Sequence, residues 1–282
     1  MLQDLPVGTQ TFEEVRTKNA VYVDKTNYFP LLPKGRKVVF CARPRRFGKS
    51  LTISALEAFF SGRKELFQGL AVEKYMNSPE FFPKPVIHLD MSELDNCVSL
   101  ENLETKARNY LKKIAKQYNV PLQSDDVASA FSNLLTDVHD ITSQKIVLLI
   151  DEYDTPVISL IQRNLTYDHL LIEQTRNFMS SFYSKIKSND QYLDFIFITG
   201  VSKFSRMGVF STLNNLVDIS TNPEFASFMG LTQEELERDF APYVKATAEW
   251  LQMEERELLE RIRGYYDGFS FDGVTRVYNP FS

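Results

Sequence analysis

Short apolar runs in the first part of the chain constrain its fold more than any other feature. Four of them are rich in Val, Ile, Leu and Phe and have the length of single strands, namely Val38–Ala42, Val86–Asp90, Ile146–Ile150 and Phe195–Thr199. They lack the regular polar alternation of a strand with one face in water. Strands buried on both faces are typical of a mostly parallel sheet covered by helices. A short fifth strand is expected at Leu216–Ile219.

Segments with helical periodicity separate these runs. Apolar residues recur at three- and four-residue spacing over about 51–60, 99–118, 125–139 and 170–187. The alternation of strands and helices predicts an α/β fold with a mostly parallel sheet flanked by helices.

The pattern changes after Gly230. Thr232–Glu235 has the spacing of a capping box and opens a region that is helical to about Tyr266. We therefore predict two parts. Residues 1–229 form the main domain with an N-terminal lead-in segment, and residues 230–282 form a helical appendage or lid and the start of a C-terminal domain that the sequence does not contain.

Composition excludes several classes of protein. The chain has 282 residues, 43 % of them hydrophobic and 24 % charged, as in ordinary soluble proteins. A net charge of −5 argues against a surface that grips nucleic acid throughout, although it leaves a local basic patch open. Two cysteines, no signal peptide and no long apolar window predict a cytoplasmic protein without a membrane span.

The loop between the first strand and the first helix carries the strongest functional motif. It reads Arg-Pro-Arg-Arg-Phe-Gly-Lys-Ser over 43–50, and phosphate-binding P-loops read Gly-x-x-x-x-Gly-Lys-Ser/Thr between a strand and a helix. Gly48, Lys49 and Ser50 match that pattern, whereas Arg43 replaces the first glycine. Pro44 can preset the backbone of the turn instead, because its φ is fixed.

Each residue type in this loop suits a part of a nucleotide. Backbone N–H groups and the helix N-terminus favour an anion, so the nucleotide is expected to contact Arg45, Arg46, Phe47, Gly48, Lys49, Ser50 and Leu51. Lys49 should reach the β- and γ-phosphates, and the Ser50 hydroxyl should bind Mg²⁺. The alternative for Arg45 and Arg46 is a solvated basic turn.

A catalytic nucleotide site also needs acids on a neighbouring strand. Ile146–Ile150 runs directly into Asp151 and Glu152. Asp151 is expected to hold Mg²⁺, and Glu152 is expected to act as the base that orients the attacking water. An apolar strand ending in Asp-Glu is typical of the ASCE-type P-loop NTPases, and the alternative is a strand that simply ends in exposed acids.

Polar residues near the next strand ends complete the predicted site. Thr199 is expected to sense the γ-phosphate or the lytic water, and its alternative is an ordinary strand end. Asp154 either supports the site or caps the following helix. Ser202, Lys203 and Arg206 follow Thr199, and Arg206 is the candidate for an arginine finger within the chain.

Several motifs together resemble the bacterial AAA-ATPase-like family of predicted ATPases. They are the loop at 43–50, Asp-Glu-Tyr-Asp-Thr-Pro at 151–156, Gly-Val-Ser-Lys-Phe at 200–204, and similar stretches at 5–8, 22–26, 266–269 and 278–282. The resemblance covers nearly the whole chain, and an arginine in place of the first loop glycine is typical of the family. It implies an ATPase module, which members usually join to a C-terminal PD-(D/E)XK nuclease-like domain after the Tyr-Asn-Pro-Phe-Ser stretch.

We therefore expect an ATP-binding P-loop protein with Mg²⁺-dependent hydrolysis. A nucleotide-dependent switch with little hydrolysis, and a nucleic-acid-linked regulatory module of an attached nuclease-like domain, are the alternatives. The expected ligands are ATP and Mg²⁺, and the choice between ATP and GTP stays open. A homo-oligomer, and nucleic acid bound through the absent domain, are possible partners.

Overall fold

The fold was determined as a computed structural model, which describes residues 2–163, 169–202, 215–266 and 268–280. The predicted site residues Lys203 and Arg206 lie outside these ranges. No helix within them is long and apolar enough to cross a lipid bilayer.

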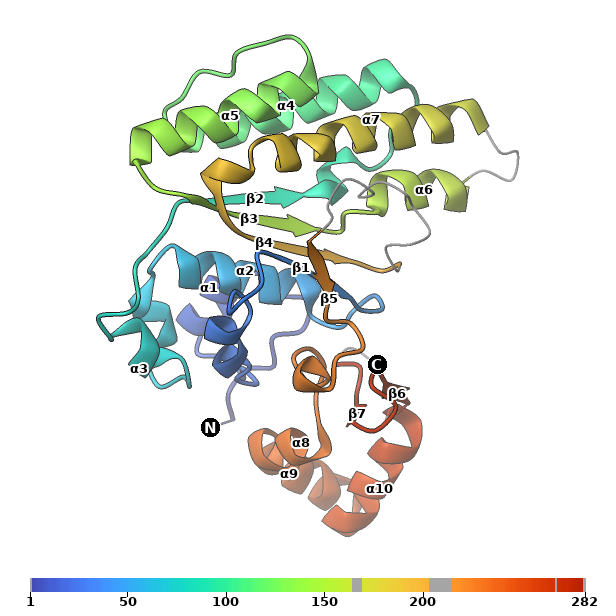
Figure 1. The fold of residues 1–282 in the computed structure, drawn as a ribbon. Helices are drawn as coiled ribbons and strands as arrows, with labels where there is room; N and C mark the ends of the chain where they lie inside the picture. Colours follow the sequence, from blue (N-terminus) through green and yellow to red (C-terminus); the bar gives the residue numbers. More distant parts are fainter. Residues whose placement is uncertain (1, 164–168, 203–214, 267, 281–282) are drawn as a thin grey trace.

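In the part of the chain that the structure describes, five parallel strands form the central sheet in the order β2-β3-β4-β1-β5 (Figure 1). Every strand predicted from the sequence is present. Their bounds are β1 (Val38–Ala42), β2 (Val86–Asp90), β3 (Ile146–Asp151), β4 (Leu193–Gly200) and β5 (Leu216–Asp218). Strand β4 lies between β1, which leads into the loop at 43–50, and β3, which ends in the acids. Because parallel strands end at one edge, this order brings the loop and the acids to the same edge of the sheet.

Helices cover both faces of the sheet, as the alternation of elements predicted (Figure 1). Alternate residues of β3 supply the two cores: Leu148 packs with the helices of one face and Val147 with those of the other. The first face carries α4 (Leu100–Gln117), α5 (Val127–Thr142) and α7 (His169–Ser188), and the second carries α1 (Phe12–Thr17), α2 (Lys49–Phe60) and α3 (Glu73–Met76). Helix α6 (Thr155–Arg163) follows β3.

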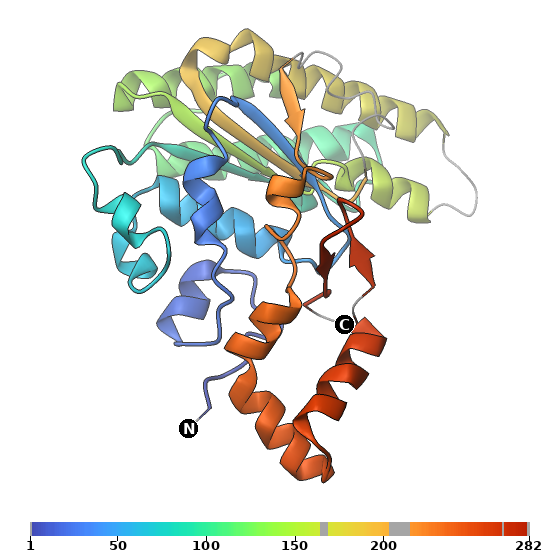
Figure 2. The same cartoon turned by 60° about the horizontal axis from the view of Figure 1, so that its bottom comes forward.

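Within the described residues, the C-terminal part consists of helices and a small hairpin (Figure 2). The helices are α8 (Gln233–Asp239), α9 (Ala241–Leu251) and α10 (Glu255–Tyr266). The predicted capping box is present, because the Thr232 side chain accepts from Glu235 N while the Glu235 side chain accepts from Thr232 N. The hairpin pairs β6 (Phe269–Ser270) with β7 (Arg276–Val277) and was not predicted from the sequence.

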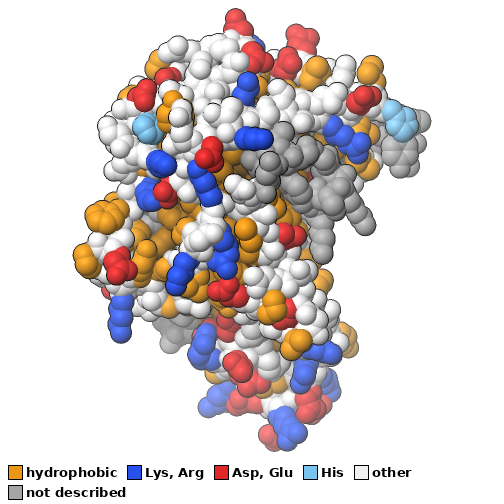
Figure 3. All heavy atoms as spheres, viewed as in Figure 1, with side chains coloured by type: hydrophobic (Ala, Val, Ile, Leu, Met, Phe, Trp, Pro, Cys, Tyr) orange, Lys and Arg blue, Asp and Glu red, His pale blue; other side chains and the backbone are white. Residues whose placement is uncertain are grey.

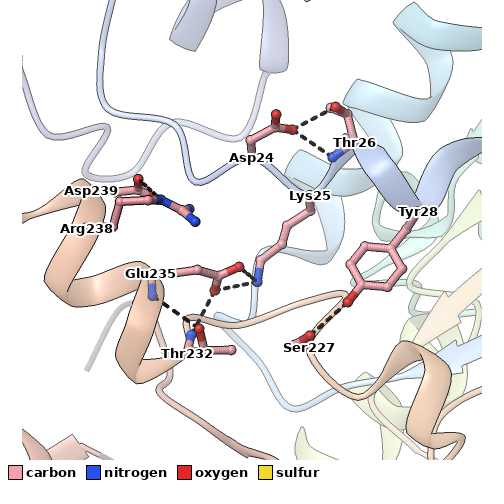
Figure 4. A network of polar contacts seen from close by, with 9 residues as sticks. All are labelled: Asp24, Lys25, Thr26, Tyr28, Ser227, Thr232, Glu235, Arg238 and Asp239. Atoms are coloured by element: carbon pink, nitrogen blue, oxygen red, sulfur yellow. Dashed lines mark hydrogen bonds and ion pairs between the residues drawn. The ribbon is translucent and has the colours of Figure 1, made fainter. Parts of the chain in front are cut away.

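The N-terminal lead-in holds the first of these helices in place (Figure 4). Lys25 Nζ contacts both carboxylate oxygens of Glu235 at 2.5 and 2.6 Å, and the two side chains are only 10 % and 14 % exposed. The hydroxyls of Tyr28 and Ser227 are 2.8 Å apart. Burial lowers the pKa of Lys25, and the Glu235 carboxylate offsets part of that effect. These contacts join residues about 200 positions apart in the chain.

Candidate functional site

The loop at 43–50 reaches α2 through a glycine in the left-handed region. Gly48 has φ 80° and precedes the first helical residue, Lys49, without any side-chain cap. A Cβ at Gly48 would meet nothing within 4 Å, so its conformation rather than crowding requires glycine. The first N–H groups of α2 are therefore left uncapped by side chains at this edge of the sheet, which is the geometry that favours an anion.

Some side chains of the loop are buried and others are exposed. Lys49 is 5 % exposed, and its Nζ donates to the Pro44 carbonyl at 3.2 Å. Phe47 is buried and Leu51 packs against the core, so these two residues offer a ligand their backbone N–H groups. Arg45 is exposed and donates to Gln162 Oε1 of α6 at 3.1 Å.

Asp151, the last residue of β3, is buried and held by hydrogen bonds. It is 2 % exposed, and its Oδ1 accepts from the Thr199 hydroxyl and, at 3.0 Å, from Glu152 N. Thr199, on β4, is fully buried and thus orients the carboxylate from the neighbouring strand. Within the described ranges no group donates to Asp151 Oδ2, so this oxygen is left for a ligand.

Glu152 occupies a costly environment. Its φ of 51° places a non-glycine residue in the left-handed region, and such strain is concentrated at functional sites. Thr155 Oγ1 donates to Glu152 Oε2 at 3.0 Å. Burial raises the pKa of the Glu152 carboxyl; the Thr155 hydrogen bond opposes this, and the nearby Asp151 carboxylate adds to it. A carboxylate with a raised pKa is suited to accept a proton.

Asp154 fastens the end of β4 to the end of β3. It is 1 % exposed and accepts from Ser202 N at 2.8 Å, from Ser202 Oγ at 2.5 Å and from Val201 N. Of its two predicted roles, these contacts support the first, because the side chain braces the loop after β4. Gly200 makes the approach possible, since a Cβ there would lie 2.5 Å from the Tyr153 ring.

Lys49 lies close enough to the acids for their charges to interact. Burial lowers the pKa of Lys49, and the carboxylates of Asp151, Glu152 and Asp154 counteract this effect. The predicted residues Lys49, Asp151, Glu152 and Thr199 are thus brought together, although they come from three separate segments.

The residues present fit a magnesium ion that arrives with a nucleotide. Ser50, next to Lys49, supplies a hydroxyl and Asp151 a free carboxylate oxygen, both hard oxygen donors. Among the described residues no group of three or more His, Cys, Asp or Glu could hold a metal ion alone. Mg²⁺ bound by one or two protein groups plus phosphate oxygens needs no such group.

Two features of the site were not anticipated from the sequence. The first is the hydrogen bond from the Thr155 hydroxyl to the Glu152 carboxylate. The sequence signal that could have indicated it is a threonine at the start of the helix that follows the acids. The buried side chain of Arg43 bonds distant backbone, and no spacing rule points to those partners.

Comparison with known proteins places the chain in a family. The predicted AAA-ATPase family matches residues 6–210. The chain is also 32 % identical over 278 residues to an uncharacterised protein in the vnfD 5′ region of Azotobacter chroococcum mcd 1. That match covers 98 % of this chain and 50 % of the relative, so the chain spans about half the length of that relative. The family match over most of the chain, on a parallel sheet with the loop 43–50 at its edge, makes this protein a member of the predicted AAA-ATPase family.

Proposed function

We propose that this protein binds ATP with Mg²⁺ at the loop 43–50 and hydrolyses it to ADP and phosphate. The observation that carries the proposal is the strand order: β4 alone separates β1, which leads into the loop with the buried Lys49, from β3, which runs into Asp151 and Glu152. The uncapped N-terminus of α2 and the buried Lys49 supply the positive charge that attracts the phosphates. The acids supply the groups for metal binding and proton transfer.

Each residue has a defined task in this reaction. The N–H groups of Gly48, Lys49 and Ser50 cradle the phosphates, and Lys49 leaves the Pro44 carbonyl to bind the β- and γ-phosphate oxygens. Ser50 and Asp151 would hold Mg²⁺, which neutralises charge on the phosphates when bound.

Hydrolysis depends on the acid next to Asp151. Glu152 accepts a proton from the water that attacks the γ-phosphorus, while the bond from that phosphorus to the β-γ bridging oxygen breaks. Thr199 keeps Asp151 in position and is a positioning residue in this scheme.

Phosphate release from ATP tests the proposal. We expect purified wild-type protein to release phosphate in a Mg²⁺-dependent reaction, and Lys49→Ala and Glu152→Gln to lower the rate by about 100-fold or more. Equal release by the wild type and both variants would rule the proposal out. ATP binding without release by the wild type would instead support a nucleotide-dependent switch.

A nucleic-acid-linked role has weaker support. On the face shown in Figure 3, acidic and basic side chains are intermixed over the lobe formed by α8, α9 and α10. Such a surface lacks the field of one sign that attracts a phosphate backbone. A nuclease-like domain beyond this chain stays a prediction from the family resemblance.

A further inference from the structure

Arg43, which replaces the first glycine of the usual phosphate loop, is one of the most buried residues of the protein. It is 1 % exposed. Its Nη1 donates to the Ser220 carbonyl at 2.7 Å, and its Nη2 donates to the Phe225 carbonyl at 3.1 Å. Its guanidinium carbon lies 3.9 Å from the centre of the Phe271 ring. The residue therefore ties the start of the loop to the segment after β5 and to the β6–β7 hairpin.

Phe47, further along the same loop, contacts the same hairpin. Its ring centre lies 4.8 Å from that of Phe269 and 5.4 Å from that of Phe271, both edge-on. It also packs against Gly230, where a Cβ would lie 3.2 Å from the Phe47 ring. Two side chains of the phosphate loop thus share Phe271 as a neighbour (the hairpin itself lies between the sheet and α10 in Figure 2).

The chemistry of these contacts makes them sensitive to geometry. Among the described residues no carboxylate forms an ion pair with Arg43, and its Nε has no hydrogen-bond partner. The desolvated cation is therefore stabilised by carbonyl dipoles and by the Phe271 face. Lysine cannot reproduce a planar group that bonds two carbonyls and stacks at once. A shift of the hairpin would remove the Phe271 ring from the buried Arg43 guanidinium and leave its charge less stabilised. The loop and the hairpin therefore stabilise each other in their present positions.

From these contacts we propose that Arg43 is the positioning residue of the phosphate loop and that, with Phe47, it couples ATP binding to the β6–β7 hairpin. The proposal rests on the ATP-binding function proposed above. It extends the ATP-binding unit past the family match at residues 6–210, because Ser220, Phe225 and Phe271 all lie beyond it. Coupling of two sites is reciprocal, so ATP should order the hairpin and an intact hairpin should strengthen ATP binding.

Three variants separate this coupling from a general loss of structure. Arg43→Lys keeps the charge and removes the planar group, and Phe271→Leu removes the aromatic face from the hairpin side without touching the loop. Val274→Ala is the matched control on the same hairpin, because Val274 is 85 % exposed. Phe269→Leu serves in place of Phe271→Leu if the latter does not fold.

Amide hydrogen exchange without nucleotide tests the positioning role independently of ATP. We expect Arg43→Lys and Phe271→Leu each to speed exchange at 43–50 by about tenfold, and Val274→Ala to leave it unchanged. Folded variants with wild-type exchange in the loop would overturn the positioning role. If the wild-type protein binds no ATP but the loop responds as stated, the proposed function fails while the positioning role stands.

Calorimetric titration with Mg·ATP, together with exchange at 268–278, tests the coupling. We expect Arg43→Lys and Phe271→Leu each to weaken Mg·ATP binding by about tenfold, and Val274→Ala to leave it unchanged. The double variant Arg43→Lys/Phe271→Leu should bind Mg·ATP about as weakly as the weaker of the two single variants. In the wild type, Mg·ATP should slow exchange in the hairpin. Binding of Mg·ATP with no change in the hairpin, or additive effects in the double variant, would overturn the coupling.

Discussion

At the scale of single residues, the candidate site combines an unfavourable backbone conformation with a buried charge. Glu152 has a left-handed backbone and a partly desolvated carboxyl, and Lys49 holds a buried ammonium. Both arrangements cost free energy of folding, and neither improves packing. Their position at the carboxyl edge of a parallel sheet gives that cost a functional explanation.

The pH dependence of hydrolysis should follow the environment of Glu152. The pKa of the Glu152 carboxyl is raised above the ordinary value of 4.5, so the carboxylate becomes protonated at a higher pH than a free glutamate does. Because only the carboxylate can accept a proton, activity should be lost as the pH falls through this raised pKa. Because the Thr155 hydroxyl lowers that pKa, Thr155→Val should move the acid limb of the pH–rate profile to higher pH. The ionisation of ATP is the same in the assays of the wild type and of Thr155→Val, so it cannot cause a difference between them. An acid limb at the same pH in both proteins would contradict the role given to Glu152.

The hydroxyl of Thr199 should matter more than its shape. Thr199→Val is nearly isosteric but deprives Asp151 Oδ1 of a donor, whereas Thr199→Ser keeps it. We expect kcat to fall by about 100-fold in the valine variant and by less than about threefold in the serine variant. Steady-state kinetics at saturating Mg·ATP measure both, and similar rates for the two variants would mean that the hydroxyl has no positioning role.

At the scale of elements, the sequence predicted the strands and motifs that adjacent residues encode. It did not predict the hairpin, which contacts between distant residues stabilise. Strands β1, β2, β3 and β4 follow from apolar runs of at least five residues, and the loop and acids follow from motifs of adjacent residues. The hairpin has strands of two residues and is stabilised by Phe47, more than 200 positions away, so no periodicity marks it. The contacts of Arg43 and Thr155 stayed hidden because a sequence pattern does not state where a side chain points.

The junction between β4 and β3 gives an element-scale prediction. In Gly200→Ala the new Cβ would lie 2.5 Å from the Tyr153 ring and 2.8 Å from Asp154 Oδ1, so the strand ends must separate. We expect a loss of about 2 kcal/mol in the free energy of unfolding.

Gly264, inside α10, is the matched control for this substitution. A Cβ there meets nothing within 4 Å, so Gly264→Ala should gain about 0.5 kcal/mol from helix propensity. Denaturant unfolding measures both changes, and equal effects at the two positions would contradict the crowded junction.

At the scale of the whole molecule, the C-terminal part joins the rest of the protein through several contacts among the described residues, and two of these junctions matter most here. One is the Lys25–Glu235 ion pair with its surrounding hydrogen bonds (Figure 4), and the other is the contact of the hairpin with Arg43 and Phe47. The second junction reaches the phosphate loop itself. The C-terminal part is therefore placed to respond to a nucleotide, although its helices lie away from the sheet.

Replacing only the lysine of the Lys25–Glu235 ion pair should destabilise the protein more than replacing both residues. Lys25→Met leaves the Glu235 carboxylate nearly buried without its cation, and we expect a loss of about 3 kcal/mol in the free energy of unfolding. Lys25→Met/Glu235→Gln removes the stranded charge and should recover part of that loss. A double-mutant cycle in denaturant measures the coupling, and additive effects would show that the two residues do not stabilise each other.

Equilibrium binding of Mg·ATP tests the central claim most directly. In calorimetric titrations, wild-type protein and Glu152→Gln should bind Mg·ATP with similar affinity, because Glu152 acts on the water rather than on the phosphates. Lys49→Ala should bind at least about 100-fold more weakly, since it loses a charge-assisted contact to the phosphates. Wild-type protein that gives no binding heat and no displacement of a labelled nucleotide, or Lys49→Ala that binds as tightly as wild type, would contradict the phosphate loop as the nucleotide site.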